Sequence, residues 1–469
     1  MGVEPIGILT LLIGLICMWR GSGATVIAFS ILPVLGGAAA VMFGSTGIQP
    51  GHLFIAFLAF SILWGRGEPS STIDIALRSS PVMWLGLLVA YGILSGYFSP
   101  RMLSNAIEIV PIGAQATPNS DGTVPLGPVG GNFTQAIYLI ADLITFSLIL
   151  SIASTPNGFR NVTIGLMGFA AANLSFGIAD MVSPGTPLVT MFTYIRNAQY
   201  AFHADEIVSG MRRIIGSWPE AASFAGISLG VVGFCGTLWI CGRHSATNGI
   251  LFLLSCLMIV RSTSSGGLAG LPVCLGILYV TSVFRAGGMS GTRASVIVLL
   301  GFPLVTLMVA FFLILNQGFY DLVYDYIEVT ILSKPTSPSA IERGTWNAYG
   351  LSNFFDSYGF GVGLGTSRTS SFAVALLSNV GVPGTIFFLM FLFTSVLRPR
   401  GIPRSYPADV GLAARNGCLC LIVGALISGT TLDLGLYFFI MAGLKSAIPT
   451  NPSNFGLIEA RELIRKQEA

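Results

Sequence analysis

The sequence contains little charge and little histidine. Of its 469 residues, 9% are Asp, Glu, Lys or Arg, and three are His. Soluble globular chains carry roughly a quarter of charged residues. An ordinary soluble protein is therefore excluded, and nucleic acid is not an expected partner.

The sequence also lacks the cysteine patterns that mark disulfide frameworks and metal sites. Its seven cysteines all fall inside apolar runs, and none lies in the longer loops between them. Their spacing matches neither a disulfide scaffold nor a set of metal ligands. We interpret them as small apolar packing residues, and we expect no metal site and no cofactor.

Long apolar runs, by contrast, recur along the whole chain. The mean hydropathy is +0.79, and a helix of roughly 20 apolar residues is long enough to cross a bilayer. We therefore predict an all-α polytopic membrane protein with about 12 to 14 transmembrane helices, forming one integral domain over residues 1–469. The predicted spans cover residues 5–19, 24–43, 51–64, 82–98, 136–153, 162–179, 221–241, 248–260, 268–284, 295–315, 373–397, 416–432 and 434–448.

Basic residues fix the orientation, because Lys and Arg resist translocation across the membrane. Residues 398–415 carry four arginines, so we place this segment, and with it the tail 449–469, in the cytoplasm. Three longer loops then face outwards, namely 99–135, 180–220 and 316–372. The first is rich in Gly, Pro and small polar residues, whereas the other two concentrate charge. We expect the active site in these two charged loops.

Two adjacent arginines, Arg212 and Arg213, precede Gly216 and Glu220 at the entry to a predicted span. An arginine presents planar, permanently charged donors that can pair bidentately with phosphate oxygens. The same side chains could instead snorkel to lipid headgroups at the membrane surface. The sequence leaves both interpretations open.

Arg343 and Arg368, in the second charged loop, also allow either phosphate binding or a structural role. Arg343 could bind phosphate, or it could pair with its neighbour Glu342 or with Asp356. If a reaction at this site needs a general base, Glu220, Glu342 and Asp356 are the available carboxylates.

Three further polar residues have weaker signals. Arg261 ends a predicted span among Ser, Thr and Gly, where it either snorkels or lines a polar cavity. His203 is the only histidine in an outward loop, and we interpret it as a surface residue rather than a base. Asp142 is the one acid placed within a span, where it serves either a function or a structural hydrogen bond.

The run GFGVGLG, residues 359–365, is not interpreted as a nucleotide-binding loop, because it follows no predicted strand. Its glycines allow the backbone to turn sharply or to approach a ligand closely, so Gly363 and Gly365 are candidate substrate contacts. Residues 378–393, SNVGVPGTIFFLMFLF, then open an apolar run with glycine and proline. We interpret this segment as closing the outward loop over the site.

The order of these features resembles the family of O-antigen ligases and Wzy-type polysaccharide polymerases. The shared features are many spans, an Arg-x-x-Gly element before a proline (Arg213 to Gly216), a Ser/Thr/Gly element opening a later span, and a large outward loop. That loop holds an arginine and ends in Gly-x-Gly-x-Gly, followed by a small polar pair and a closing Gly-x-x-Gly, Gly381 and Gly384. The resemblance covers roughly residues 160–400.

The resemblance implies a GT-C-like fold and an inverting, metal-independent glycosyltransferase. Its donor would be a glycan on a polyprenyl diphosphate at the periplasmic face of the bacterial inner membrane, and its acceptor would be a sugar hydroxyl. Membrane lipids, a chain-length regulator and export machinery are further implied partners. The catalytic candidates are Arg213, Arg343, Glu220 and Glu342, and the candidates for binding the diphosphate and glycan are Arg212, Arg261, Arg368, Ser370, Ser371, Gly363 and Gly365.

Two positions depart from the family pattern. Relatives carry His-Asn shortly before the closing glycine, where this chain has Ser370 and Ser371. Gly266 stands where the family's Ser-Arg-Gly element has arginine, and Arg261 or Arg368 could substitute in space. The missing histidine favours a polymerase over a ligase. A flippase or transporter is the alternative from another class, and it should show internal repeats and charged or broken helices at mid-membrane.

Overall fold

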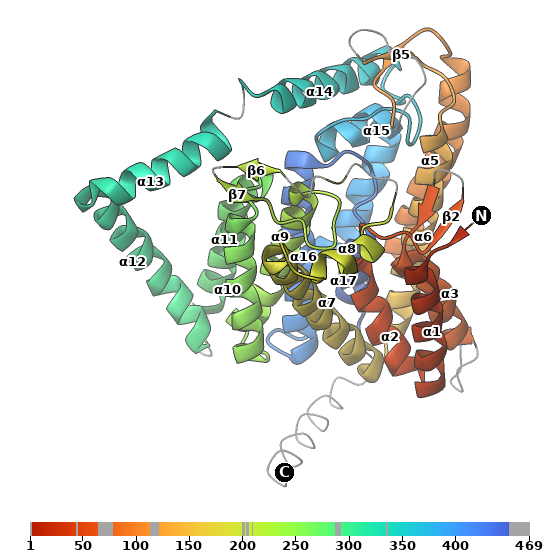
Figure 1. Ribbon diagram of the computed structural model, residues 1–469. Coiled ribbons are helices and arrows are strands. Elements are labelled where there is room, and N and C mark those ends of the chain that lie inside the picture. The colour runs from red at the N-terminus through yellow and green to blue at the C-terminus, as the bar shows by residue number, and fades with distance from the viewer. Residues whose placement is uncertain are drawn as a thin grey trace.

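The computed structural model describes residues 2–43, 46–63, 78–112, 122–198, 202, 206–208, 210–286, 292–333 and 336–449 (Figure 1). His203 and residues 450–469 of the predicted tail lie outside these ranges.

Each predicted apolar run contains a helix. Among the described residues, eight helices are long and apolar enough to cross a membrane, so the chain is an all-α, multi-pass membrane protein, as predicted. The predicted number of 12 to 14 transmembrane helices is not confirmed, because the other predicted spans contain shorter helices. These eight are α5 (Ser80–Met102), α6 (Gly130–Ala153), α7 (Pro156–Val182), α9 (Ala221–Ile240), α11 (Ser265–Ala286), α12 (Arg293–Leu315), α15 (Phe372–Leu392) with its π-helical extension η4 (Phe393–Leu397), and α16 (Tyr406–Ser428). The shorter apolar helices are α1 (Pro5–Arg20), α2 (Ser22–Ile31) with the 3-10 turn η1 (Leu32–Val34), α3 (Pro50–Leu63), α10 (Ser245–Arg261) and α17 (Leu436–Ser446).

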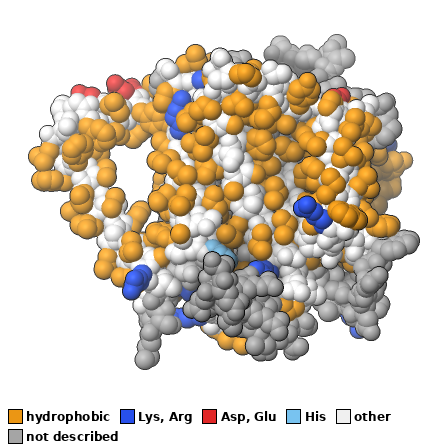
Figure 2. Space-filling model, turned by 60° about the horizontal axis from the view of Figure 1, so that its bottom comes forward, with side chains coloured by type: hydrophobic (Ala, Val, Ile, Leu, Met, Phe, Trp, Pro, Cys, Tyr) orange, Lys and Arg blue, Asp and Glu red, His pale blue; other side chains and the backbone are white. Residues whose placement is uncertain are grey.

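On the face shown in Figure 2, hydrophobic side chains cover most of the coloured surface. On α12 only Ala294 and Ser295 are buried, whereas Leu304 and Leu307 are 58% and 68% exposed. An exterior of this kind is unfavourable in water and is stabilised by lipid.

The centre of the bundle is α9, which packs against α10, α11 and α16 (Figure 1). Small residues permit this close packing: a Cβ at Gly233 would lie 2.6 Å from the carbonyl oxygen of Asn416. The Asn416 amide then donates to the hydroxyls of Thr237 and Thr281, both at 2.9 Å. One buried side chain thus connects three helices.

Short strands and surface helices lie outside this core. β1 (Gly2–Val3), β2 (Val41–Phe43) and β3 (Thr46–Ile48) form an antiparallel sheet that pairs Gly2 with Met42 and Val41 with Ile48. The other elements are β4 (Glu108–Ile109) paired with β5 (Val124–Pro125), β6 (Ile207–Val208) paired with β7 (Met211–Arg212), and the helices α8 (Leu188–Ile195), α13 (Gln317–Ile327), η2 (Glu328–Leu332) and α14 (Pro338–Asp356).

The predicted span 24–43 is wrong in its second half. The helical segment ends at Val34, and residues 41–43 form β2. Proline at position 33 has no amide donor, and a Cβ at Gly36 would lie 2.1 Å from the ring of Trp218. The following residues are apolar because they are buried in protein, with Ala38 0% exposed, and not because they cross lipid.

Other boundaries also differ from prediction. α16 begins at Tyr406 rather than at 416, so Arg415 lies inside the helix. Residues 180–220 and 316–372 are more regular than loops, because α7 continues to Val182 and because α13, η2 and α14 occupy much of the second segment.

Candidate functional site

The bundle has two polar ends. We call the end that carries β4, β5, α14 and residues 211–220 the loop end, and the end that carries residues 241–245 and 398–409 the basic end; they lie at the top and bottom of Figure 1. All of the predicted site residues that the structure describes lie in the elements of the loop end or at the helix termini beside it.

A buried aspartate organises the first charged segment of the loop end. Asp180, in the last turn of α7, is 0% exposed. Its Oδ1 atom accepts from Arg196 at 2.7 Å and from Arg212 at 3.4 Å. Its Oδ2 atom accepts from the backbone amides of Ile215 and Gly216, at 2.8 and 3.1 Å. We call this set the Asp180 network. It neutralises the charge of the buried carboxylate and provides hydrogen bonds to both of its oxygens.

The neighbouring arginines are also engaged with protein groups. Arg261 donates to the carbonyl oxygen of Arg212 at 3.0 Å, and Arg213 forms an ion pair of 2.6 Å with Glu206. Arg212, Arg213 and Arg261 were predicted to bind or act on a substrate. The structure gives each of them a protein partner.

The glycine run makes the sharp turn that the sequence predicts. Gly365 has a φ of +73°, and a Cβ there would lie 2.3 Å from the carbonyl oxygen of Gly131 in α6. Gly381, at the kink in α15, has a φ of +58°, and a Cβ there would lie 2.2 Å from the carbonyl oxygen of Gly359. The close approach is therefore between backbones. The two candidate contacts Gly363 and Gly365 are buried against protein.

The start of α15 holds this turn in place. Asn379 Oδ1 accepts from the amides of Thr366 and Ser367, both at 3.0 Å. Its Nδ2 atom donates to the carbonyls of Ser367 and Ala375, at 2.9 and 3.1 Å. The Val382 amide donates to the Gly359 carbonyl at 2.8 Å. Every hydrogen-bonding atom of the asparagine side chain is thus used to fix the turn.

Arg368 projects from this rigid turn. Its own amide donates to the Val110 carbonyl at 2.8 Å, and its guanidinium lies 4.0 Å from the ring centroid of Trp346 in α14. Partial burial lowers the pKa of Arg368, the charges of Glu342 and Glu220 act to raise it, and that of Arg343 lowers it further. Such effects fall off steeply with distance.

The charges of Glu342, Glu220 and Arg343 thus all act on Arg368. We call these four predicted site residues, which come from three separate parts of the chain, the arginine cluster: Arg343, Arg368, Glu220 and Glu342. Within the described residues, none of these four side chains forms a hydrogen bond or an ion pair. Glu342, Glu220 and Arg343 therefore influence Arg368 without a direct bond to it in the described part of the chain. This arrangement can receive an anion and a proton.

The remaining candidates lie beside the cluster. Ser370 is 4% exposed, and its amide donates to Asn347 Oδ1 at 2.8 Å. Ser371 is the N-cap residue of α15. Asp356, the third candidate base, accepts a hydrogen bond from Ser352 at 2.9 Å at the far end of α14.

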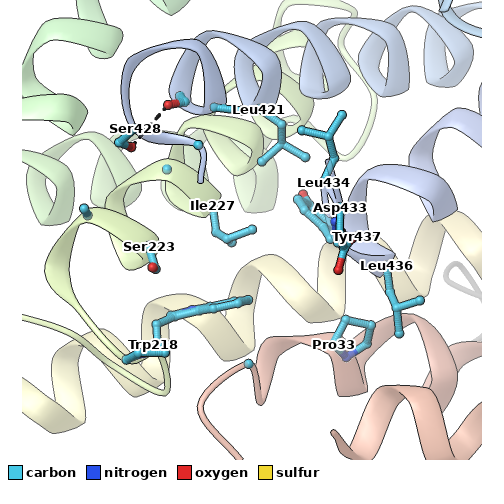
Figure 3. Close-up of a pocket in the computed structure, with 18 of the residues that line it drawn as sticks. Pro33, Trp218, Ser223, Ile227, Leu421, Ser428, Asp433, Leu434, Leu436 and Tyr437 are labelled. Atoms are coloured by element: carbon cyan, nitrogen blue, oxygen red, sulfur yellow. Dashed lines mark hydrogen bonds between the residues drawn. The ribbon is translucent and has the colours of Figure 1, made fainter. Parts of the chain in front are cut away.

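A cavity of about 320 Å³ adjoins the cluster at Glu220. α9, α16 and the extended segment 429–435 enclose it, and Trp218, Asp433 and Tyr437 are among its lining side chains (Figure 3). The ring nitrogens of His52, which also lines it, have no hydrogen-bond partner within the described residues. We call it the inner cavity. Its volume is at the small end of the range typical of small-molecule sites.

Sequence analysis missed the polar lining of this cavity. Asp433 stands between Gly429 and Gly435 in the short gap between two predicted spans, and that position was the available signal. Asp142, correctly placed inside a span, is 0% exposed and interacts electrostatically with Asp433. Neither of its carboxylate oxygens has a hydrogen-bond partner within the described chain.

The loop end thus combines unpaired arginines, an adjacent carboxylate and a polar cavity. No protein-family model matches the chain, and no curated protein is significantly similar to it. The function must therefore be inferred from the site itself.

Proposed function

We propose that the protein is a polysaccharide polymerase, an inverting glycosyltransferase that joins polyprenyl-diphosphate-linked repeat units at the periplasmic face of a bacterial inner membrane. The observation that carries the proposal is that Arg343 and Arg368 form no ion pair within the described residues, that the charges of Arg343 and Glu220 act on Arg368, and that Glu220 also lines the inner cavity. A diphosphate needs cations that are free to bind it, and a sugar needs a polar space next to them.

In this reaction an acceptor hydroxyl attacks the anomeric carbon of the donor glycan. The new carbon–oxygen bond forms as the bond to the diphosphate oxygen breaks, and the polyprenyl diphosphate leaves with the electron pair. Arg343 and Arg368 would stabilise the negative charge that develops on the leaving group. Their planar donors suit two phosphate oxygens at once.

The acceptor hydroxyl must also lose its proton. Glu220 is the carboxylate that both adjoins the arginines and lines the inner cavity, whereas Asp356 is hydrogen-bonded to Ser352 and Glu342 is exposed on α14. We assign the role of general base to Glu220. It would compensate for the serines that replace the histidine of the resembling family.

A transporter is the second candidate, because one observation favours it. α16 and α17 are separated by the extended segment 429–435, and Asp433 in that segment faces the buried Asp142. Broken helices with interior carboxylates are typical of transporters. The position of the unpaired arginines at one end of the bundle favours the polymerase instead.

The test is alanine substitution of Arg343 and Arg368 in the native host, with glycan length resolved on a gel and lipid-linked intermediates assayed. We expect transfer to slow by roughly 10²- to 10³-fold, with single lipid-linked repeat units accumulating at the outer face. Arg101→Ala is the matched control, because this exposed arginine already donates to the Tyr97 carbonyl.

The other outcomes discriminate between the candidates. Full-length chains retained on polyprenyl diphosphate would indicate a ligase, and repeat units trapped inside the cell would indicate a transporter. Normal long chains in both arginine variants would contradict the role of the cluster.

A further inference from the structure

The basic end contains two groups of positively charged side chains, which differ in whether an acidic side chain pairs with them. Arg243 and Arg285 pair with the buried Asp409 at 2.9 and 2.5 Å. Lys445, in the last turn of α17, is 6% exposed and forms no hydrogen bond or ion pair within the described residues. The charges of Arg400 and Arg415 act on it.

Lys445 and Arg400 line one small pocket of about 30 Å³, between the 398–405 segment, the start of α16 and the end of α17. The lysine stem reaches it by passing Gly411, where an added Cβ would lie 3.7 Å from the lysine Cδ. No Asp or Glu is among the residues that line the pocket.

The local backbone compensates only part of this charge. Arg400 donates to the carbonyls of Thr394 and Ser395, and the last turn of α17 supplies roughly half a negative charge through the helix dipole. The formal charges of Lys445 and Arg400 remain against it, and the charge of Arg415 also acts on Lys445. A buried cation without a counter-charge is strongly unfavourable, so an anion in the pocket would stabilise the charged lysine.

We propose that this pocket binds a phosphate group, with Lys445 and Arg400 as its ligands. Its volume of about 30 Å³ excludes a large ligand. The phosphate can belong to an anionic phospholipid headgroup or to free inorganic phosphate. The site is independent of the arginine cluster at the opposite end of the bundle.

The experiment measures thermal unfolding of the full chain in nanodiscs. The lipid arm compares phosphatidylglycerol with phosphatidylcholine, and the free-ion arm adds inorganic phosphate in phosphatidylcholine against sodium chloride of equal ionic strength. Lys445→Met is the main variant, because methionine keeps the stem and removes the charge. Arg293→Met is the control, because it removes one exposed charge at the same end.

We expect phosphatidylglycerol or inorganic phosphate to raise the unfolding temperature of the wild type and of Arg293→Met. In Lys445→Met the affinity for that ligand should fall by roughly tenfold or more, as for a lost charge-assisted hydrogen bond. Stabilisation by phosphatidylglycerol alone identifies a headgroup, and stabilisation by inorganic phosphate identifies the free ion. If neither ligand stabilises the wild type, or if the effect is equal in Lys445→Met, the proposal is wrong.

Discussion

The Asp180 network and the arginine cluster lie at the same end of the bundle and use the same residue types, but they differ in pairing. Arg196 and Arg212 converge on one buried carboxylate with bonds of 2.7 and 3.4 Å. Arg343 and Arg368 have carboxylates near them and bond to neither. The arginines of the Asp180 network are neutralised by a protein carboxylate, whereas Arg343 and Arg368 form no ion pair within the described residues.

This difference teaches how to separate structural from functional arginines in a chain with little charge. Removing one member of a buried ion pair leaves an uncompensated charge and lowers the free energy of unfolding. Removing an unpaired arginine near the surface changes stability little and affects what the protein binds. Proximity to an acid in the sequence does not distinguish the two cases, whereas geometry does.

The largest expected effect comes from breaking the paired set. Asp180→Asn keeps the shape of the side chain and removes the buried negative charge that Arg196 and Arg212 share, so we expect a loss of roughly 3–5 kcal/mol in stability. The measurement is thermal unfolding and the yield of monodisperse protein in detergent. Asp356→Asn, which changes a carboxylate bonded only to Ser352, should behave as wild type. An unchanged unfolding temperature in Asp180→Asn would show that the Asp180 network does not stabilise the fold.

A smaller effect is expected at the turn that carries Arg368. Gly365→Ala places a Cβ 2.3 Å from the Gly131 carbonyl oxygen in a left-handed backbone conformation, which should cost roughly 1–3 kcal/mol. Thermal unfolding and glycan length should both be affected, because the turn positions the arginine. Gly86→Ala is the control, since nothing lies within 4 Å of the added atom. Equal stability of the two variants would show that the turn adapts freely.

The smallest expected effect concerns the aromatic contact of the unpaired set. Trp346→Leu removes the ring that lies 4.0 Å from the Arg368 guanidinium, an interaction of roughly 0.5–1 kcal/mol at exposed sites. We expect transfer to slow a few-fold while the unfolding temperature stays near that of wild type. A loss as large as in Arg368→Ala would mean that Trp346 itself contacts the substrate.

The membrane helices were predictable because lipid imposes one requirement on every span. A run of apolar residues long enough to cross has few alternatives, and each predicted span contains a helix. The prediction was wrong for the second half of residues 24–43, because burial in protein selects the same apolar residues as lipid does, as at Ala38. Hydropathy does not distinguish a lipid environment from a protein interior.

Candidate site residues could be named from the sequence, but their surroundings could not be predicted. Sequence reasoning named Arg343, Arg368, Glu220 and Glu342, and in the structure the charges of the other three act on Arg368. It could not separate them from Arg212, because the partner of that arginine is 32 positions away in the chain. Asp433 was missed because an acid in a short gap between spans looks like an ordinary polar boundary.

The exposure of α12 has a consequence for the position of α14, the helix that carries Arg343. This helix of 23 residues buries only Ala294 and Ser295, and with α13 it stands away from the bundle (Figures 1 and 2). At 1.5 Å per residue it is about 35 Å long. It contacts α11, as in the Tyr279 and Phe302 rings 5.4 Å apart, but it is otherwise exposed, so we expect its tilt to adjust to the thickness of the bilayer. Because α13 and η2 lie between α12 and α14 in the chain, we expect the position of Arg343 relative to Arg368 to respond to membrane thickness. Lipid composition would then be a variable of the proposed site.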